Sequence, residues 1–425
     1  MKILVLGSGA REDAIVRSLL AETPRPEVIV SPGNAGISAL AQTIEMDIND
    51  GDVISDYAIK NNIDLVIVGP EAPLAAGVAN EPRERGIAIF GPDADAAELE
   101  GSKSFAKRIM DSAGVPTGRS ARVGSLQEVD AAFAEFGAPY VVKADGLAAG
   151  KGVLVTEDFA AAHAHAEYWL NHGSVLIEEF LSGPEVSLFY LSDGFNVLPL
   201  SPAQDFKRLL DGDEGPNTGG MGSYSPLPWL KDRFGSEDAF VQEVTDKVAL
   251  PVIRQLDLED TPFIGLLYCG LILTEDGIKV IEFNARFGDP ETQVVLARMK
   301  TPLSKLLFAA ATGTLTGVPA PEFSSDAAIS VVLASEGYPE NTITGRVISG
   351  IAAAEATGVQ VLHAATQLND ESDFVATGGR VLNVVATGSD LRAAREKAYV
   401  ALSKITLEGG QYRLDIAQKV AEASQ

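Results

Sequence analysis

The sequence has little cysteine, a shortage of positive charge and no long apolar stretch, and each shortage argues against a class of protein. Cys269 is the only cysteine among 425 residues, so no intrachain disulfide can form, and we expect a reducing compartment. A formal net charge of −26 disfavours nucleic-acid backbones and anionic membrane surfaces as partners. No apolar run approaches the ~20 residues that cross a bilayer. We therefore expect a cytoplasmic protein without nucleic-acid or membrane partners.

What is present describes a folded α/β chain of several units. Hydrophobic residues make up 46% and charged residues 22%, and the length exceeds what one core usually holds. The first hundred residues alternate strands with helices, which predicts a doubly wound parallel sheet. Ligands of such sheets lie beyond the carboxyl ends of the strands. The predicted strands are 3–6, 28–30, 64–68 and 87–90, with a helix over 11–21.

Later segments predict a strand-rich middle and a small α+β end. Strands are expected at 140–143, 153–156, 175–180 and 264–273, a helix at 238–255 and a long irregular polar loop at 205–224. Residues 319–325, with two prolines and polar neighbours, are the best linker candidate. After it, strands at 327–334 and 380–387 and an amphipathic helix at 390–405 indicate a separate small unit.

The most informative segment is Lys279–Glu291. Val280, Ile281 and Phe283 favour a strand, on which Glu282, Asn284 and Arg286 would share one face. A carboxylate beside an amide oxygen forms a pair of hard ligands suited to Mg²⁺, which borrows its other ligands from water and phosphate. Arg286 would hold an anion near that metal.

A glycine-rich hairpin supplies a second signal. Residues 141–153 place three glycines and three alanines between two strands, so their backbone amides are unshielded and can close over a polyphosphate. Lys143 and Lys151 would add point charges. The lysine is followed by glycine and a strand, unlike the nucleoside-triphosphatase P-loop. Downstream, Glu178-Glu179-Phe180 and Glu185 could read an adenine edge and ribose hydroxyls.

The loop Gly7–Glu12, between the first strand and first helix, could attract a phosphate through its backbone amides. A dinucleotide fingerprint is the alternative interpretation. It is disfavoured because Glu12 occupies the position of the third glycine and the second strand ends at Val30-Ser31 without an acid.

The order of these motifs resembles the ATP-grasp superfamily and, more narrowly, the family of phosphoribosylamine–glycine ligases. Further segments that resemble the family are Gly69–Leu74, Leu99–Lys103, Pro216–Gly222 and Gly378–Leu382. The resemblance implies an N-terminal unit at 1–100, an ATP-grasp domain at 101–320 with a lid at about 120–188, and a C-terminal α+β domain at 326–425. It also implies a cytoplasmic ligase, expected to be monomeric, that uses ATP with Mg²⁺ or Mn²⁺.

The implied reaction joins glycine to 5-phosphoribosylamine in purine biosynthesis. ATP phosphorylates the glycine carboxylate, and the amine attacks glycyl phosphate to give glycinamide ribonucleotide, ADP and phosphate. The alternative is another ATP-grasp carboxylate–amine ligase with a different acceptor.

The resemblance also assigns roles to residues. Arg286, Lys151 and Asp205 would be catalytic, and Glu282 and Asn284 would hold the metal. The nucleotide would contact Lys103, Lys143, Gly146, Gly150, Gly152, Glu178, Glu179, Phe180 and Glu185. The substrates would contact Gly9, Arg11, Glu12, Asn34, Glu71, Lys207, Arg208, Asn217, Gly220 and Asp289.

Two departures from the family pattern fall on the acceptor side. Asp13 and Phe206 stand where the family usually has histidines, and Asp13 is expected to repel an approaching phosphate. The strand before the metal pair offers only Tyr268 and Cys269, so waters would complete the coordination. Cys269 and the histidines at 163, 165, 172 and 363 are expected to be structural or solvated.

Overall fold

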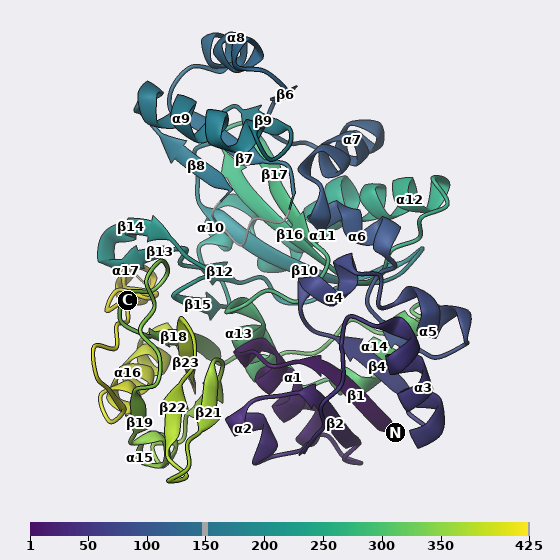
Figure 1. The fold of residues 1–425 in the computed structure, drawn as a ribbon, viewed down its shortest axis with the longest axis vertical. Helices are drawn as coiled ribbons and strands as arrows, with labels where there is room; N and C mark the ends of the chain where they lie inside the picture. Colours follow the sequence, from purple (N-terminus) through teal and green to yellow (C-terminus); the bar gives the residue numbers. More distant parts are fainter. Residues whose placement is uncertain (147–151, 424–425) are drawn as a thin grey trace.

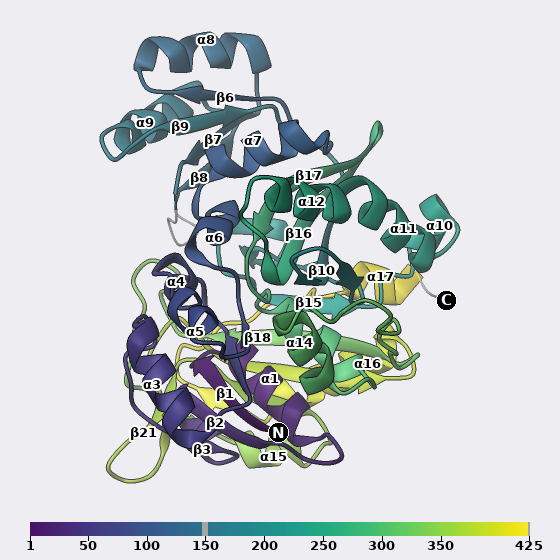
Figure 2. The same ribbon diagram turned by 90° about the vertical axis from the view of Figure 1, so that its right-hand side faces the viewer.

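The computed structural model describes residues 1–146 and 152–423. Figures 1 and 2 both place an antiparallel subdomain at one end of the molecule, with the N-terminal sheet at the opposite end beside the C-terminal unit. The strands that carry the predicted metal pair lie between these ends. Within the described ranges, none of the helices has the length and apolar character that crossing a membrane requires.

The N-terminal sheet is parallel, with strand order β3-β2-β1-β4-β5. Its central strands are continuous apolar runs because both faces are covered. This confirms the predicted parallel α/β unit. The strands are β1 (Lys2–Gly7), β2 (Glu27–Pro32), β3 (Gln42–Thr43), β4 (Leu65–Val68) and β5 (Ile89–Phe90). The helices are α1 (Ala10–Leu20), α2 (Ala35–Ser38), α3 (Gly51–Asn61), α4 (Glu71–Ala75), α5 (Asn80–Glu84) and α6 (Ala94–Gly101).

The antiparallel subdomain has strand order β6-β9-β7-β8 and a core of its own that includes Val129, Phe133, Val142 and Ile177. It follows α7 (Lys103–Ala113), which Ser102 caps. Its elements are β6 (Ser120–Val123), α8 (Leu126–Phe136), β7 (Tyr140–Ala144), β8 (Val153–Thr156), α9 (Phe159–Leu170) and β9 (Val175–Glu178). The predicted strand at 175–180 therefore ends two residues early.

The central sheet runs β11-β10-β16-β17 and is antiparallel. Helices cover it, including the segment predicted at 238–255. Its strands are β10 (Glu185–Asp193), β11 (Val197–Pro199), β16 (Ile264–Thr274) and β17 (Gly277–Asn284). The helices are α10 (Leu230–Phe234), α11 (Glu237–Val244), a π-turn (Thr245–Ala249), α12 (Leu250–Leu258), α13 (Glu291–Arg298) and α14 (Leu303–Ala311). Cys269 is a free, fully buried thiol on β16.

The prediction of an irregular loop at 205–224 is wrong. The segment forms four short strands around a 3₁₀ turn, Asp211–Asp213. They are β12 (Gln204–Asp205), β13 (Arg208–Leu210), β14 (Glu214–Asn217) and β15 (Gly222–Ser225). Strands of two to four residues without alternation of apolar and polar residues cannot be recognised from the sequence pattern. The partner of β15 is β18, about a hundred residues later, so tertiary pairing decides its conformation.

The C-terminal unit is built on a sheet that includes earlier strands, in the order β12-β15-β18-β23-β20. The pairing of β15 with β18 crosses the predicted linker at 319–325, and the proposed domain limits stay a prediction. The main strands are β18 (Ala327–Ala334), β20 (Gln360–His363) and β23 (Arg380–Gly388). A second sheet has the order β21 (Thr366–Leu368), β22 (Phe374–Ala376), β19 (Val347–Ser349) and β24 (Thr406–Leu407). The helices are α15 (Ile351–Glu355), α16 (Leu391–Leu402) and α17 (Gln418–Ala423).

Asp13 joins the N-terminal and C-terminal units, and the expectation that it repels substrate phosphate is wrong. Its fully buried carboxylate pairs with Arg17 Nε at 2.8 Å and accepts the backbone N–H of His363 at 2.7 Å. Burial raises the pKa of Asp13, and Arg17 and the His363 amide act in the opposite direction. The carboxylate therefore bonds the C-terminal unit instead of facing the first loop.

Asp13→Asn should lower the free energy of unfolding by about 2 kcal/mol, because a charge-assisted bond to Arg17 is lost inside an interface. Denaturant unfolding measures the change. Asp370→Asn, an exposed position in the same C-terminal unit, is the control and should change little. Equal, small effects of the two substitutions on the free energy of unfolding would contradict the conclusion that Asp13 joins the N-terminal and C-terminal units.

Candidate active site

The predicted metal pair lies at the carboxyl end of β17, which pairs with β16. Asn284 stands opposite Tyr268, and Glu282 stands opposite Gly270, so both ligands share a face as predicted. A β-bulge after Gly270 leaves Ile281 unpaired. A Cβ on Gly270 would lie 3.2 Å from Glu282 Cγ, so glycine leaves space for the carboxylate.

Lysines gather around this strand from α7 and β7. Lys143 Nζ pairs with Glu178 Oε2 at 2.9 Å and reaches the carbonyl of the bulged Ile281 at 3.4 Å. Lys103 Nζ donates to the carbonyl of Gly146 at 3.0 Å. Lys107, which sequence reasoning missed, approaches the other oxygen of Glu178 at 3.5 Å. The glycine-hairpin strand and the metal strand thus border one site.

The electrostatics of Glu282 reflect these cations. Burial raises the pKa of Glu282, but Lys207, Lys143, Lys103 and Arg286 together bring it below its usual value. The pKa of Lys103 is lowered by burial and by Lys143, against the attraction of Glu282. The carboxylate is therefore held ionised within a cationic surround that suits a polyphosphate and its metal.

The donor set at this strand fits Mg²⁺ or Mn²⁺. A carboxylate and an amide oxygen on one face provide hard ligands, and phosphate oxygens and waters suit the rest of the coordination. Within the described residues there is no group of three or more His, Cys, Asp or Glu arranged to hold a metal by themselves.

Arg286 lies between two carboxylates just beyond β17. Its NH2 is 3.1 Å from Glu100 Oε1, and its Nε is 3.5 Å from Glu71 Oε2. Burial acts to lower the pKa of Arg286, but the carboxylates of Glu100 and Glu71 raise it by more. The guanidinium therefore stays charged. Glu100 also accepts the backbone N–H of Ala285 at 2.7 Å. Sequence reasoning assigned no role to Glu100, although it lies within the segment Leu99–Lys103 that resembles the family.

A second cluster of charged side chains lies where β12 contacts β10. Lys207 Nζ donates to Glu185 Oε2 at 2.5 Å, so Glu185 faces a lysine in this structure. Burial, with help from Glu291 and Glu185, raises the pKa of Asp205 to about 7, although Lys207 lowers it. A carboxyl group with that pKa can exchange protons near neutrality.

A buried hydrogen-bonded triad adjoins the metal strand and was missed from sequence. Tyr268 Oη donates to Glu291 Oε1 at 2.9 Å, and Ser187 Oγ lies within 3.0 Å of both. Gly288 leaves room for it, because a Cβ there would lie 2.8 Å from Glu291 Oε2. Of the three residues, the sequence analysis named only Tyr268, on the strand before the metal pair, and the register places it opposite Asn284.

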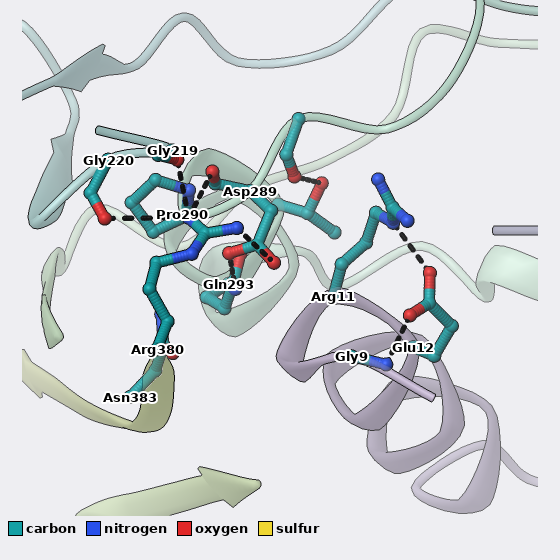
Figure 3. A network of polar contacts seen from close by, with 12 residues as sticks. Gly9, Arg11, Glu12, Gly219, Gly220, Asp289, Pro290, Gln293, Arg380 and Asn383 are labelled. Carbon is teal, nitrogen blue, oxygen red and sulfur yellow. Dashed lines mark hydrogen bonds and ion pairs between the residues drawn. The ribbon is translucent and has the colours of Figure 1, made fainter. Parts of the chain in front are cut away.

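Hydrogen bonds of its own residues stabilise the first loop, Gly7–Glu12. Glu12 accepts from the Gly9 amide at 2.6 Å and from Arg11 Nε at 2.6 Å (Figure 3). Arg11 NH1 donates to the Phe287 carbonyl at 3.1 Å. Asn34 bonds Ile37 N, Ser8 O and His363 O. Glu12 and Asn34 thus support the loop, and their direct contact with substrate stays a prediction.

Other predicted residues fall around the same region. Arg208 NH1 bonds Asn217 Oδ1 at 3.2 Å across the β13–β14 hairpin. Phe206, in place of the family's histidine, packs beneath the buried guanidinium of Arg413. The Cζ atom of Arg413 lies 4.8 Å from the centroid of the Phe206 ring. Gly220 and Asp289 meet beside Arg380.

The remaining residues predicted to contact the nucleotide lie in different environments. Lys151 and Gly150 lie outside the described residues, whereas the carbonyl of Gly152 accepts from Ala144 N at 2.8 Å. Phe180 is 46% exposed. Glu179 bonds the backbone and side chain of Arg119 and pairs with Lys279, and these partners bring its pKa to about 2 despite burial. Its carboxylate is thus held by protein partners.

Clustered lysines beside a carboxylate–amide pair, between an antiparallel subdomain and a central sheet, define an ATP-grasp ligase. Models of phosphoribosylglycinamide synthetase match its N domain over residues 1–100, its ATP-grasp (A) domain over 101–292 and its C domain over 328–419. The chain belongs to this family. Its predicted class, an ADP-forming ligase that uses ATP with Mg²⁺ or Mn²⁺, is thereby confirmed.

Individual relatives agree over the full length. The chain is 63% identical to a phosphoribosylamine–glycine ligase of Leifsonia xyli, covering 99% of this chain and 100% of that one. It is 55% identical to one from Streptomyces coelicolor, covering 100% of both. A crystal structure of phosphoribosylamine–glycine ligase from Thermotoga maritima superposes with a TM-score of 0.81 at 31% identity, covering 98% of this chain and 100% of that one.

Glu179→Gln should lower the free energy of unfolding by about 1 kcal/mol at neutral pH and leave the KM for ATP unchanged, because its partners are protein groups. The folded pKa lies below the unfolded value, so this stabilisation is present above about 4.5 and is lost as pH falls toward 2. Denaturant titrations at several pH values measure it. Glu157→Gln, exposed in the same subdomain, is the control; a raised KM with unchanged stability would refute this assignment.

Proposed function

We propose that this protein ligates glycine to 5-phosphoribosylamine through glycyl phosphate, giving glycinamide ribonucleotide, ADP and phosphate in purine biosynthesis. The observation that carries the proposal is the position of Lys143 against the Ile281 carbonyl, next to Glu282, whose pKa is lowered by Lys207, Lys143, Lys103 and Arg286. Phosphoryl transfer needs positioning and charge neutralisation more than covalent chemistry, and this group of side chains supplies both. We further propose that the protein acts as a monomer in the cytoplasm.

The residues around β17 would have different roles according to their positions. Lys103 and Lys143 would bind the phosphates of ATP, and Glu282 and Asn284 would hold the divalent cation that neutralises them. Arg286 lies two residues beyond the end of the same strand, where it would stabilise negative charge on the acyl phosphate and on the oxyanion formed during attack. Glu71 and Glu100 keep its guanidinium in place.

On the acceptor side, the amine must lose a proton as it attacks. Asp205 would take that proton, because its pKa of about 7 lets it be a carboxylate before the step and an acid after it. Lys207 lies beside it and would attract an anionic acceptor. Arg11, anchored to the loop that follows Arg286, extends the positive charge toward the first loop.

A direct assay tests the proposal. Purified protein with ATP, Mg²⁺, glycine and phosphoribosylamine should form glycinamide ribonucleotide with one ADP per product. Replacing glycine with other amino acids, or phosphoribosylamine with other amines, should abolish turnover. Preferred turnover with a different acceptor would overturn the proposal and support a different ATP-grasp ligase.

Arg286→Ala should lower turnover by about 10²–10³ while ATP binding stays near normal, because one donor to the developing charge is lost. It also leaves Glu71 and Glu100 without their cation and should lower stability. Arg286→Lys keeps a cation but loses the planar fork, so turnover should fall while stability is retained. Steady-state kinetics and denaturant unfolding separate the two effects. Near-normal turnover in either variant would show that Arg286 does not contact the reacting groups.

Asp205 should give the acid limb of the pH profile. Below pH about 7 its carboxyl is protonated and cannot accept a proton, so kcat/KM for the amine should fall as pH decreases through that value. Asp205→Asn should lower kcat/KM and remove this limb. Glu214→Gln, an exposed carboxylate on the neighbouring hairpin, should leave the profile unchanged. An unchanged acid limb in Asp205→Asn would assign the titration to another group.

A further inference from the structure

Arg380, on β23 of the C-terminal unit, reaches into the acceptor side and contacts two separate segments there (Figure 3). Its NH1 donates to the carbonyl oxygens of Gly219, Gly220 and Asp289, and its NH2 is 3.1 Å from Asp289 Oδ2. One guanidinium therefore holds the turn before β15 against the loop that follows the metal strand.

The packing around this contact leaves little freedom. Gly220 has a φ of +105°, and a Cβ on it would lie 2.4 Å from Pro290 Cδ. The amide of Gly219 donates to Tyr338 Oη at 2.9 Å, so a second residue of the C-terminal unit holds the same turn. A side chain on either glycine would therefore separate the two segments that Arg380 joins.

Arg380 also orients Asp289. Gln293 Nε2 donates to Asp289 Oδ1 at 2.8 Å, and Arg380 holds Oδ2, so both oxygens are fixed. A Cβ built on Gly9 would lie 3.9 Å from Asp289 Oδ2, which places the first loop next to this carboxylate. Three segments that the family resemblance assigns to the substrates thus meet around Asp289, whose carboxylate is held by an arginine from another unit.

The C-terminal unit is itself held in register with the first loop. His363 donates its amide to Asp13 and its carbonyl accepts from Asn34 at 2.7 Å, while Arg17 NH2 donates to the Val361 carbonyl. These bonds tie β20 to α1 and α2. Since β20 pairs with β23, they also fix the strand that carries Arg380.

We propose that Arg380 is a positioning residue for the amine acceptor, through which the C-terminal unit shapes the acceptor pocket. The inference rests on the proposed function. Arg380 acts through Asp289 and the 219–220 turn, and among the described residues its hydrogen bonds and ion pair do not involve Lys103 or Lys143. Its loss should therefore affect the acceptor selectively.

Arg380→Gln should raise the KM for phosphoribosylamine about 10- to 100-fold, the range expected when charge-assisted hydrogen bonds are lost. The KM values for ATP and glycine should stay close to those of the unaltered protein. Arg380→Lys should recover part of the loss, because an ammonium retains the charge but not the fork. The control is Arg346→Gln in the same unit, where the guanidinium bonds Glu336 and the Glu408 carbonyl; it should change none of the constants.

The outcomes are distinguishable. If the unaltered protein forms no product from glycine and phosphoribosylamine, the proposed function fails. If it does, and Arg380→Gln either keeps the normal acceptor KM or raises the KM values for ATP and the acceptor equally, the positioning role is refuted. Unfolding of all three variants is measured alongside, and a selective acceptor effect in a stably folded Arg380→Lys supports the inference even if the Gln variant is less stable.

Discussion

The site depends on keeping several cations close together around one half-buried carboxylate, that of Glu282. Lys103, Lys143 and Lys207 act on Glu282, in a chain whose net charge is −26, so the positive charge is local and built by the fold. The lysines repel one another, as the lowering of the pKa of Lys103 by Lys143 shows. Glu178 and the carbonyls of Gly146 and Ile281 compensate for that repulsion. ATP phosphates would offer the lysines stronger partners, which explains how a strongly acidic protein can bind a polyanion.

The C-terminal unit borders the predicted acceptor side. Its sheet continues into β15 and β12, so the strand that carries Asp205 is part of the same hydrogen-bonded layer as β18 and β23. Asp13 fixes β20 to the first helix. Phe206 packs beneath Arg413 from the chain's last segment. The substitutions at 13 and 206, which on sequence grounds concerned only the acceptor, thus contribute to the joints between units.

The regular elements and the shared face of Glu282 and Asn284 could be predicted because their signals are local. Alternation along β17 placed Glu282 and Asn284 on one face, and apolar runs located the parallel strands. Partners distant in sequence could not be predicted. Asp13 meets His363 across 350 positions, and Arg380 meets Gly219 across 161. Lys107, Glu100 and Glu291 are ordinary helical charges until the fold buries them, and β12 to β15 are too short to carry a periodic pattern. Family resemblance supplied the reaction itself.

The most direct test of this account is a crystal structure of the protein with a non-hydrolysable ATP analogue, Mg²⁺ and glycine. The terminal phosphate should lie among Lys103, Lys143 and Glu282, with oxygens of Glu282 and Asn284 at about 2.0–2.1 Å from the metal. The glycine carboxylate should lie on the Arg286 side, roughly 3–3.5 Å from the phosphorus that it attacks. A nucleotide whose terminal phosphate and metal lie away from β17 would contradict the account.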